Sequence, residues 1–317
     1  MDLRQLRYFV GIVQAGSLSR AANQLNVAQS AISHHLAGLE TELAKQLVMR
    51  GPKGIVLTDA GAVLYRHAEA ILRHVEFAKQ DAMSALTVPS GNVGIGFPTA
   101  LTNLLSYELF VRVRKAYPQV RLHLVDGKSA LIRELLDNGR LDLAMLFAPR
   151  PERGLACEPL LLEELFFTTA GGESGPITFA EVVAQPLILP GLGSGIMQVL
   201  QDALNKRGLT MTTLGDIDTL DTVRRAVEAG IANSILPWSA LYASDRQPSV
   251  VLRRVSDTHL VRSVAVCTSG VAQRTPAIDA VASVLKTMTR EMVESGRWKG
   301  VSLIAAPDEA SLSAHPA

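Results

Sequence analysis

The stretch SLSRAANQLNVAQSAISHHLAGL, residues 17–39, decides the fold of the N-terminal region. Its first part, residues 18–25, has small or apolar side chains on one helical face, at Ala21, Ala22 and Leu25. Asn26 and Val27 interrupt this pattern, and a second helix is predicted to begin near Ala28. The stretch therefore predicts two short helices joined by a tight turn.

The second predicted helix has one apolar and one polar face. Apolar side chains recur three and four residues apart and are expected to face inward, at Ile32, Leu36 and Leu39. Polar side chains project outward near its start, at Gln29, Ser30, Ser33 and His34. Such a helix fits the major groove of DNA, where Gln pairs with adenine edges and Ser contacts bases or phosphates. On composition alone, a helical hairpin that merely covers a core fits equally well.

The residues before this stretch predict a further helix. Apolar side chains recur at helical spacing, at Leu3, Leu6, Phe9, Val10 and Val13. The helix is expected to end near Gly16, and Ser17 fits the N-cap of the helix that follows. Together these signals predict a compact helical module.

The residues after this stretch predict a β-hairpin. Residues 47–57 are extended around the turn GPKG (51–54), which puts Arg50 and Lys53 at the tip. Residues 1–58 carry six Lys or Arg against three Asp or Glu, although the formal net charge of the whole chain is only +1. The hairpin is therefore interpreted as a basic wing that contacts phosphates or the minor groove.

The order of these residues resembles the LysR-type transcriptional regulators. The matching segments are LRYF (6–9), GSL (16–18), AA (21–22), Leu25, AQSAIS (28–33), LE (39–40) and LTDAG (57–61). The resemblance implies a winged helix-turn-helix that binds DNA through Ser17, Gln29, Ser30, Ser33, His34, Arg50 and Lys53. Two departures bear on the operator, because many members have proline where Ser30 stands and arginine or glutamine around His34 and His35.

A long uninterrupted helix is predicted next. Residues 58–86 contain no proline and, after Gly61, no glycine. Apolar side chains alternate four and three residues apart, at Leu64, Ala68, Ile71, Val75, Ala78, Ala82 and Ala85. This heptad seam predicts a homodimer that presents two modules to DNA half-sites. The alternative is a single helix packed against its own domain.

The remaining two-thirds alternates strand and helix patterns, which indicates α/β architecture. Residues 92–97, 120–125 and 141–147 read as strands, whereas 101–116 and 131–138 read as helices. GRLDLA (139–144) and AGIANSILP (229–237) resemble recurring segments of LysR effector domains. The resemblance implies two α/β lobes of the periplasmic-binding-protein type, joined by strands crossing near residues 160–165 and 266–270.

The predicted domain boundaries follow from these patterns. They are 1–58 for the winged helix-turn-helix, 59–88 for the linker helix, 89–161 with 268–301 for lobe 1, 162–267 for lobe 2 and 302–317 for a tail. Within the family, residues 1–22 and LGDIDTLDTVRRAVEAGIANSILP (214–237) resemble the nitrogen assimilation control protein group.

An effector site is predicted where helices begin after strands, because helix N-termini offer free N–H groups. Thr99, Ser129 and Thr219 occupy such positions. The resemblance to the family implies that all three correspond to its effector positions. Each hydroxyl can instead simply cap its own helix. Asn103, Lys128, Ser194 and Trp238 are candidates for the same cleft, and Lys128 favours an acidic ligand.

Other chemistry finds little support in the sequence. Cys157 and Cys267 lack metal or redox spacing and are interpreted as two buried thiols, and no metal or cofactor is expected. The loop GLGSG (191–195) lacks the residues of a phosphate-binding P-loop. Neither a signal peptide nor a membrane-spanning run is present, so a cytoplasmic protein is expected rather than an exported solute carrier. An α/β enzyme is the less favoured alternative, since no nucleophile elbow or metal motif occurs.

The sequence therefore predicts a DNA-binding transcriptional regulator controlled by a small anionic metabolite between two lobes. A metabolite-independent regulator, controlled by its own level, is the alternative. The expected partners are double-stranded DNA, further copies of the chain in a homodimer or homotetramer, a small-molecule effector and RNA polymerase, with no membrane.

Overall fold

The computed structural model describes residues 1–51, 54–83, 88–147, 155–191, 194–242, 249–270 and 274–304. The chain divides into two compact units, one mainly from Met1–Val88 and the other from Pro89–Asp137, Leu141–Gly270 and Arg274–Ala317. Within the described ranges, no helix is both long and apolar enough to cross a bilayer.

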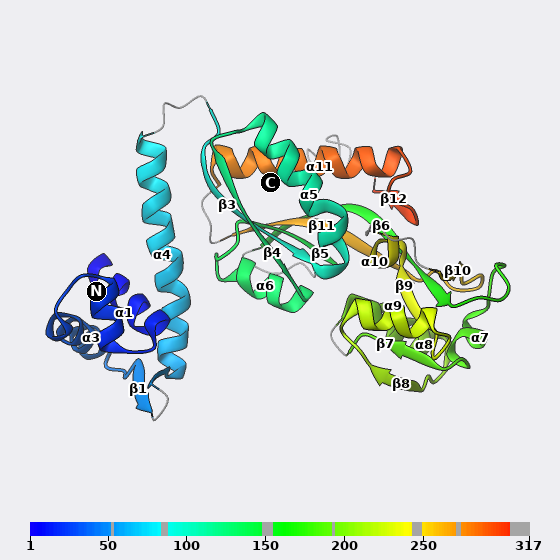
Figure 1. Ribbon diagram of the computed structural model, residues 1–317, viewed down its shortest axis with the longest axis horizontal. Coiled ribbons are helices and arrows are strands. Elements are labelled where there is room, and N and C mark those ends of the chain that lie inside the picture. The colour runs from blue at the N-terminus through cyan, green and yellow to red at the C-terminus, as the bar shows by residue number, and fades with distance from the viewer. Residues whose placement is uncertain are drawn as a thin grey trace, which may run out of the picture. The chain divides into compact units, whose positions relative to one another are not determined.

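Three helices form the core of the first unit: α1 (Leu3–Ala15), α2 (Leu18–Gln24) and α3 (Gln29–Leu43) (Figure 1). Asp2 and Gln5 form a capping box at the start of α1, and Gly16 ends it at a φ of 62°, which favours glycine. The predicted inward residues Ile32, Leu36 and Leu39 are buried. The predicted order of helix, turn and helix is therefore confirmed.

The wing is a two-stranded hairpin of β1 (Val48–Gly51) and β2 (Gly54–Leu57). The register pairs Gly51 with Gly54. The Ile55 N–H donates to the Gly16 carbonyl at 3.0 Å, so the hairpin is tied to the turn between α1 and α2. Lys53 and the side chain of Arg50 lie outside the described residues.

The long helix α4 (Asp59–Met83) packs partly on its own unit. Ala68 is fully buried in the core of the first unit, and Leu64 is partly buried against it. Ile71, by contrast, is 36% exposed. The predicted seam thus divides, because its first residues serve the home domain and Ile71 faces solvent. The Ala82 side chain and Ala85 lie outside the described residues.

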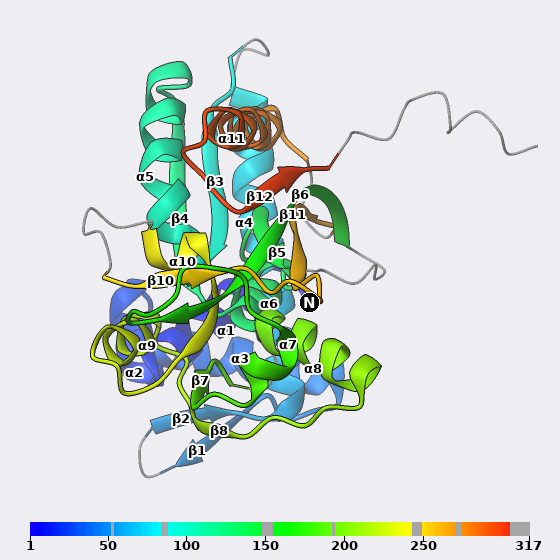
Figure 2. The same ribbon diagram turned by 90° about the vertical axis from the view of Figure 1, so that its right-hand side faces the viewer.

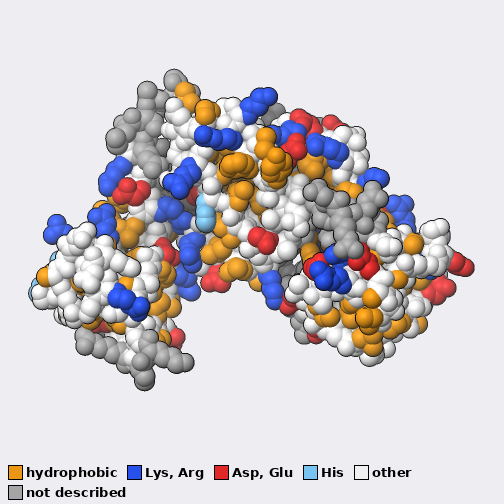
Figure 3. Space-filling model, viewed as in Figure 1, with side chains coloured by type: hydrophobic (Ala, Val, Ile, Leu, Met, Phe, Trp, Pro, Cys, Tyr) orange, Lys and Arg blue, Asp and Glu red, His pale blue; other side chains and the backbone are white. Residues whose placement is uncertain are grey.

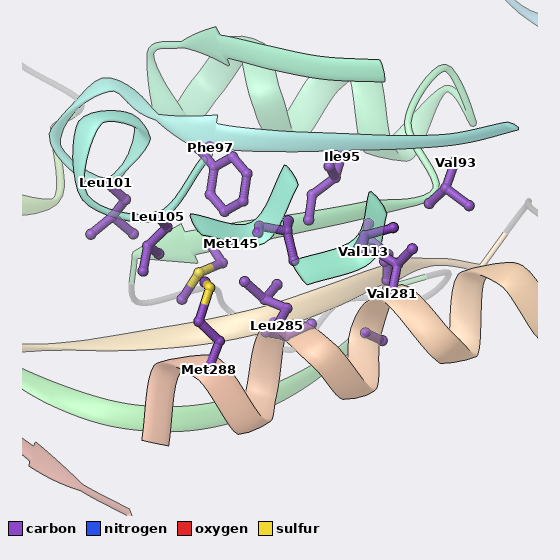
Figure 4. Close-up of a cluster of buried hydrophobic side chains, with 14 of the residues drawn as sticks. Val93, Ile95, Phe97, Leu101, Leu105, Val113, Met145, Val281, Leu285 and Met288 are labelled. Carbon is purple, nitrogen blue, oxygen red and sulfur yellow. The ribbon is translucent and has the colours of Figure 1, made fainter. Parts of the chain in front are cut away.

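Lobe 1 of the second unit is a sheet covered on both faces. Its strands include β3 (Gly91–Pro98), β4 (Val120–Gly127) and β5 (Leu143–Phe147), and its helices are α5 (Thr99–Ala116), α6 (Ser129–Asp137) and α11 (Pro276–Glu294). Leu143 and Met145 enter the core shared with α5 and α11, whereas Ala144 and Leu146 pack with α6. Figure 4 shows Met145 among the side chains of the shared core. This alternation along β5 fixes which face each helix covers.

Lobe 2 forms a second core. Its elements are α7 (Phe179–Val183), β7 (Leu187–Leu189), α8 (Gly195–Arg207), β8 (Thr213–Asp216), α9 (Leu220–Glu228), β9 (Ser234–Pro237), α10 (Trp238–Tyr242) and β10 (Val251–Arg253). Phe179, Leu200 and Val223 are fully buried there. Figure 2 shows the helices α7, α8 and α9 beside the strands β7 and β8.

Two long antiparallel strands connect the lobes: β6 (Leu155–Thr169) and β11 (Val261–Ser269). The first part of β6 pairs with β11 and β12 (Val301–Leu303), and its last part pairs with β9 and β10. Ser302 pairs with Leu162 through β12, although the sequence predicted a tail from residue 302. The tail from residue 305 lies outside the described residues.

The interpretation of the cysteines as two thiols was wrong. Cys157 on β6 and Cys267 on β11 lie directly opposite each other and form a disulfide. They are 110 residues apart in sequence, so their spacing carried no signal. Only the pairing of the two connecting strands brings them together.

We expect Gly61→Ala to destabilise the first unit. The Gly61 N–H donates to the Thr58 hydroxyl at 3.0 Å, and a Cβ here would lie only 1.9 Å from the backbone oxygen of Leu47. The backbone at Leu47 cannot move aside as a flexible side chain can. We therefore expect the free energy of unfolding to fall by about 2 kcal/mol or more. Hydrogen exchange followed by mass spectrometry measures this loss separately in peptides of residues 1–83.

Gly38→Ala in α3 is the matched control. Its added Cβ would meet only the Gln5 side chain at 3.4 Å, so a neutral or slightly stabilising effect of up to about 1 kcal/mol is expected. Equal exchange in the two variants would contradict the clash.

Candidate functional site

The start of α3 presents a polar surface. Gln29, Ser30 and His34 are exposed, and Ser33 is half-buried. Ala28 occupies the N-cap without a side-chain cap bond, and the Ala31 N–H donates to the Ala28 carbonyl at 3.1 Å. The N–H groups of Gln29 and Ser30 therefore have no side-chain cap at the positive end of the helix dipole. A phosphate or a base edge can therefore approach this end of the helix.

Gln29 is held by a residue that the sequence reasoning missed. The Ser19 hydroxyl on α2 donates to Gln29 Oε1 at 2.9 Å. A fixed amide is better suited to a bidentate contact with a base than a freely rotating one. The ten-residue separation of Ser19 and Gln29 gave no signal, because it depends on how α2 packs against α3.

The two adjacent histidines differ in their surroundings. His35 packs edge-on against Tyr8, with ring centroids 5.1 Å apart, and is half-buried. His34 is exposed. Of the pair, His34 is therefore the one that can reach a ligand at this surface.

Ser17 lies at the N-cap of α2, as predicted, but its hydroxyl makes no side-chain cap bond. Its backbone is extended there, with a φ of −161°. The hydroxyl is thus not used by the helix that it precedes, and it remains half-buried beside the turn at Gly16.

A cavity of about 550 Å³ lies between lobe 1 and lobe 2. Four predicted effector residues line it: Thr99, Asn103, Lys128 and Thr219. Ser129, Ser194 and Trp238 are not among its lining residues. Ser194 instead accepts the Met197 N–H at 3.1 Å and caps α8, and Trp238 packs against the core of lobe 1.

The hydroxyls at the cavity are not all helix caps. Thr219 precedes α9 but makes no side-chain cap bond, so its hydroxyl is not needed by that helix. Thr99 donates to the Gly127 carbonyl at 3.4 Å, which is a weak bond across the ends of two strands. These hydroxyls therefore remain able to bind a small molecule, unlike that of Ser194.

Lys128 does not stand alone in the cavity. Its Nζ donates to Asp218 Oδ2 at 2.6 Å, which joins lobe 1 to lobe 2. Asp218 Oδ1 also accepts the Gly191 N–H at 3.1 Å. The Lys128 bond, followed by the Gly191 bond, lowers the pKa of the Asp218 carboxyl below its ordinary value. Asp218 thus stays ionised at neutral pH.

Arg224 is also matched by acids. It donates to Asp221 Oδ1 at 2.5 Å and to both carboxylate oxygens of Glu228 at 2.8 and 2.9 Å. The hydrogen bond that Arg224 donates to Asp221 is the main cause that raises the pKa of Arg224. Sequence reasoning missed Asp218, Asp221 and Arg224, although the acids flank Thr219 in the segment DIDTLD (216–221).

A buried polar network connects the cavity wall to the strands between the lobes. Ser239, which lines the cavity, donates to Glu163 Oε1 at 2.5 Å. Arg262 donates twice to Glu163 Oε2, at 2.9 and 2.7 Å, and its guanidinium lies 3.4 Å from the ring centroid of Phe147. Burial lowers the pKa of Arg262, and the Glu163 charge opposes that change.

A larger cavity of about 890 Å³ lies among β6, α11 and β12. Its lining is mostly apolar, contains the disulfide residue Cys157 and includes none of the predicted effector residues. Lys286 at its edge is bound to Glu158. Its size alone does not outweigh the polar groups that converge on the smaller cavity.

Two family models match the chain, one in each of its units. Residues 3–62 match the model described as bacterial regulatory helix-turn-helix protein, lysR family. Residues 87–290 match the LysR substrate binding domain.

Curated relatives match along nearly the whole chain. The nitrogen assimilation regulatory protein nac of Escherichia coli (strain K12) is 32% identical over 95% of this chain and 100% of its own length. The protein of the same name from Klebsiella aerogenes is 31% identical over the same shares.

Solved structures share the fold. Full-length OxyR from Pseudomonas aeruginosa, in a variant form, covers 92% of this chain and 95% of its own at a TM-score of 0.71 and 23% identity. Full-length CbnR complexed with its target DNA covers 90% and 99% at a TM-score of 0.66 and 20% identity. At these identities the likeness concerns the fold alone.

We expect Glu163→Gln to destabilise the second unit strongly. Glu163 is fully buried, so its loss leaves the buried Arg262 without its counter-charge. Breaking such a pair costs about 3–5 kcal/mol. Both tryptophans, Trp238 and Trp298, belong to this unit, so urea unfolding followed by tryptophan fluorescence reports on it.

Glu164→Gln is the control at the next residue. Glu164 pairs with Arg254, which is 68% exposed, so the expected loss is about 1 kcal/mol or less. A similar loss in both variants would show that burial of the Glu163 pair is not what matters.

Proposed function

Because this chain belongs to the LysR family of bacterial transcriptional regulators, we propose that it binds operator DNA as a dimer under the control of a small carboxylate-bearing metabolite. The relatives are transcriptional regulators and not enzymes. This chain is likewise a regulator and not an enzyme. The observation that carries the proposal is the polar, uncapped start of α3 in one unit together with the polar cavity between lobes in the other.

The proposed DNA contacts divide by their chemistry. Gln29, Ser30, Ser33 and His34 are proposed to contact base edges, since α3 presents them on one surface. Ser17, Arg50 and Lys53 are proposed to contact phosphates, which fix position but carry no sequence information. A DNA complex is solved for CbnR, whose fold this chain shares.

Self-association is proposed through two apolar surfaces. On α4, Ile71 is exposed next to partly buried Val75. On α5, Tyr107, Phe110 and Val111 are 77%, 48% and 44% exposed, and hydrophobic side chains gather over this helix (Figure 3). One surface makes a dimer, and a second, distinct surface allows dimers to join into a homotetramer.

Control by a metabolite is proposed at the cavity between the lobes. Thr99, Asn103, Lys128 and Thr219 supply hydroxyl, amide and ammonium groups, and Ser129 follows directly after Lys128. A ligand that binds one arrangement of the lobes better than another shifts the population toward it. That shift changes the spacing of the DNA-bound modules.

The regulator is proposed to act in the cytoplasm, where DNA and RNA polymerase are its partners.

Gln29→Ala is expected to reduce discrimination between operator variants by about 1–3 kcal/mol, because it removes a bidentate base contact. Lys53→Ala should instead weaken binding to all sequences and reduce its salt dependence, as loss of a phosphate contact does. Titration of operator and scrambled duplexes at several salt concentrations measures both effects.

Gln201→Ala on α8 is the control, since it carries the same change in the other unit. It should leave DNA binding unaltered. If Gln29→Ala weakened binding equally on operator and scrambled DNA, its base-reading role would be wrong.

Fractionated metabolite extracts test the control by an effector. At least one fraction should raise the thermal stability of the full chain and alter its DNA footprint, because a bound ligand stabilises the state that it prefers. Fractions that change neither property would leave the alternative, a regulator controlled by its own level.

A further inference from the structure

The charges that line the cavity between the lobes cancel. Its cations are Lys128 and Arg224, and its anions are Asp218 and Asp221. Each cation of this described lining is already bound to one of these anions. A ligand that carries only negative charge therefore meets no cation without a counter-charge there.

The two ion pairs differ in how readily they can be opened. Arg224 is only 14% exposed and is held by two acids, Asp221 and Glu228. Lys128 and Asp218 are 71% and 46% exposed. Pairs in water contribute little and are separated easily, whereas Arg224 is fixed in place. The Lys128 and Asp218 pair is thus the part of the lining that a ligand can enter.

We infer that the ligand of this cavity is a small zwitterion, such as an α-amino acid, whose carboxylate binds Lys128 and whose ammonium binds Asp218. The inference rests on the proposed control by a metabolite and names its chemical class. Each ligand charge replaces one half of the existing pair, so both protein charges stay matched. A simple acid would instead leave two carboxylates facing each other at Lys128.

The surrounding groups fit the two ends of such a molecule. Lys128 directly precedes the nine-residue helix α6, and Thr99 begins the eighteen-residue helix α5, so partial positive charge lies on the carboxylate side. Helix α9 also begins close to Asp218, and there the ionised Asp218 carboxylate itself matches the partial positive charge. Asp218 keeps one oxygen on the Gly191 N–H, which holds the carboxylate in place after Lys128 leaves it. A volume of about 550 Å³ accommodates a small amino acid.

The position of the pair links recognition to the lobes. Lys128 lies in lobe 1 between β4 and α6, and Asp218 lies in lobe 2 between β8 and α9. In the free chain the two side chains bind each other directly. With a zwitterion bound, the same two side chains are bridged by the ligand and lie farther apart, so the lobes respond to the ligand's length.

The test compares matched ligands on the full chain by thermal shift and calorimetry. The probes are the twenty proteinogenic L-amino acids, and each one with an uncharged side chain, proline excepted, is paired with its 2-hydroxy acid and its decarboxylated amine. We expect at least one amino acid to bind, and its hydroxy acid and amine to bind at least tenfold more weakly. This comparison uses only the wild-type chain, so it stands even where a variant fails to fold.

The variant arm uses two Asp→Asn substitutions. Asp218→Asn should weaken the binding of the amino acid at least tenfold. Binding of the matching hydroxy acid should stay unchanged or become tighter. Asp137→Asn on α6 is the control, since Asp137 is 44% exposed and pairs with Arg133 outside the cavity lining. It should change neither affinity.

The outcomes separate this inference from the function on which it rests. A hydroxy acid that binds the wild-type chain as tightly as its amino acid overturns the zwitterion while supporting an anionic effector. If no amino acid binds, the zwitterion is also overturned, and the extract experiment alone decides whether any effector exists.

Discussion

The buried ion pair of Glu163 and Arg262 is the constraint on which the second unit depends. The two residues face each other on β6 and β11, the strands that run between the lobes. Charges taken out of water must be matched closely, so the pair fixes the register of these strands. Ser239 attaches the cavity wall to the same carboxylate. A small displacement of Ser239 at the cavity wall therefore acts on a hydrogen-bond network that has few alternative arrangements.

Periodic patterns made the DNA-binding unit largely predictable. Ile32, Leu36 and Leu39 repeat at helical spacing, and the structure buries all three. Gly16 and the turn around residues 51–54 marked boundaries because their backbone needs are local. The Ser19 contact with Gln29 was not predictable, since it arises from packing between helices. The same holds for the division of the α4 seam between its own core and solvent.

The second unit was predictable in class but not in its long-range pairings. Helix starts at Thr99 and Thr219 could be located from local signals, and both line the cavity. Asp218 could not be assigned to Lys128, because 90 residues separate them and only the fold joins them. That omission changed the expected chemistry, since a lone lysine favours an acid and a matched pair does not. The β12 strand was missed for a similar reason, as its three residues carry no period.

The disulfide between Cys157 and Cys267 gives the architecture a further property. Both cysteines belong to the part of the crossing strands that pairs within lobe 1. The disulfide therefore joins the strand that leaves lobe 1 to the strand that returns to it. The residues between Cys157 and Cys267 form a closed loop. In the chain-entropy account, closing a loop of this length restricts the unfolded chain by about 4–5 kcal/mol. Lobe 2 is in this sense an insertion whose two chain connections are joined covalently within lobe 1.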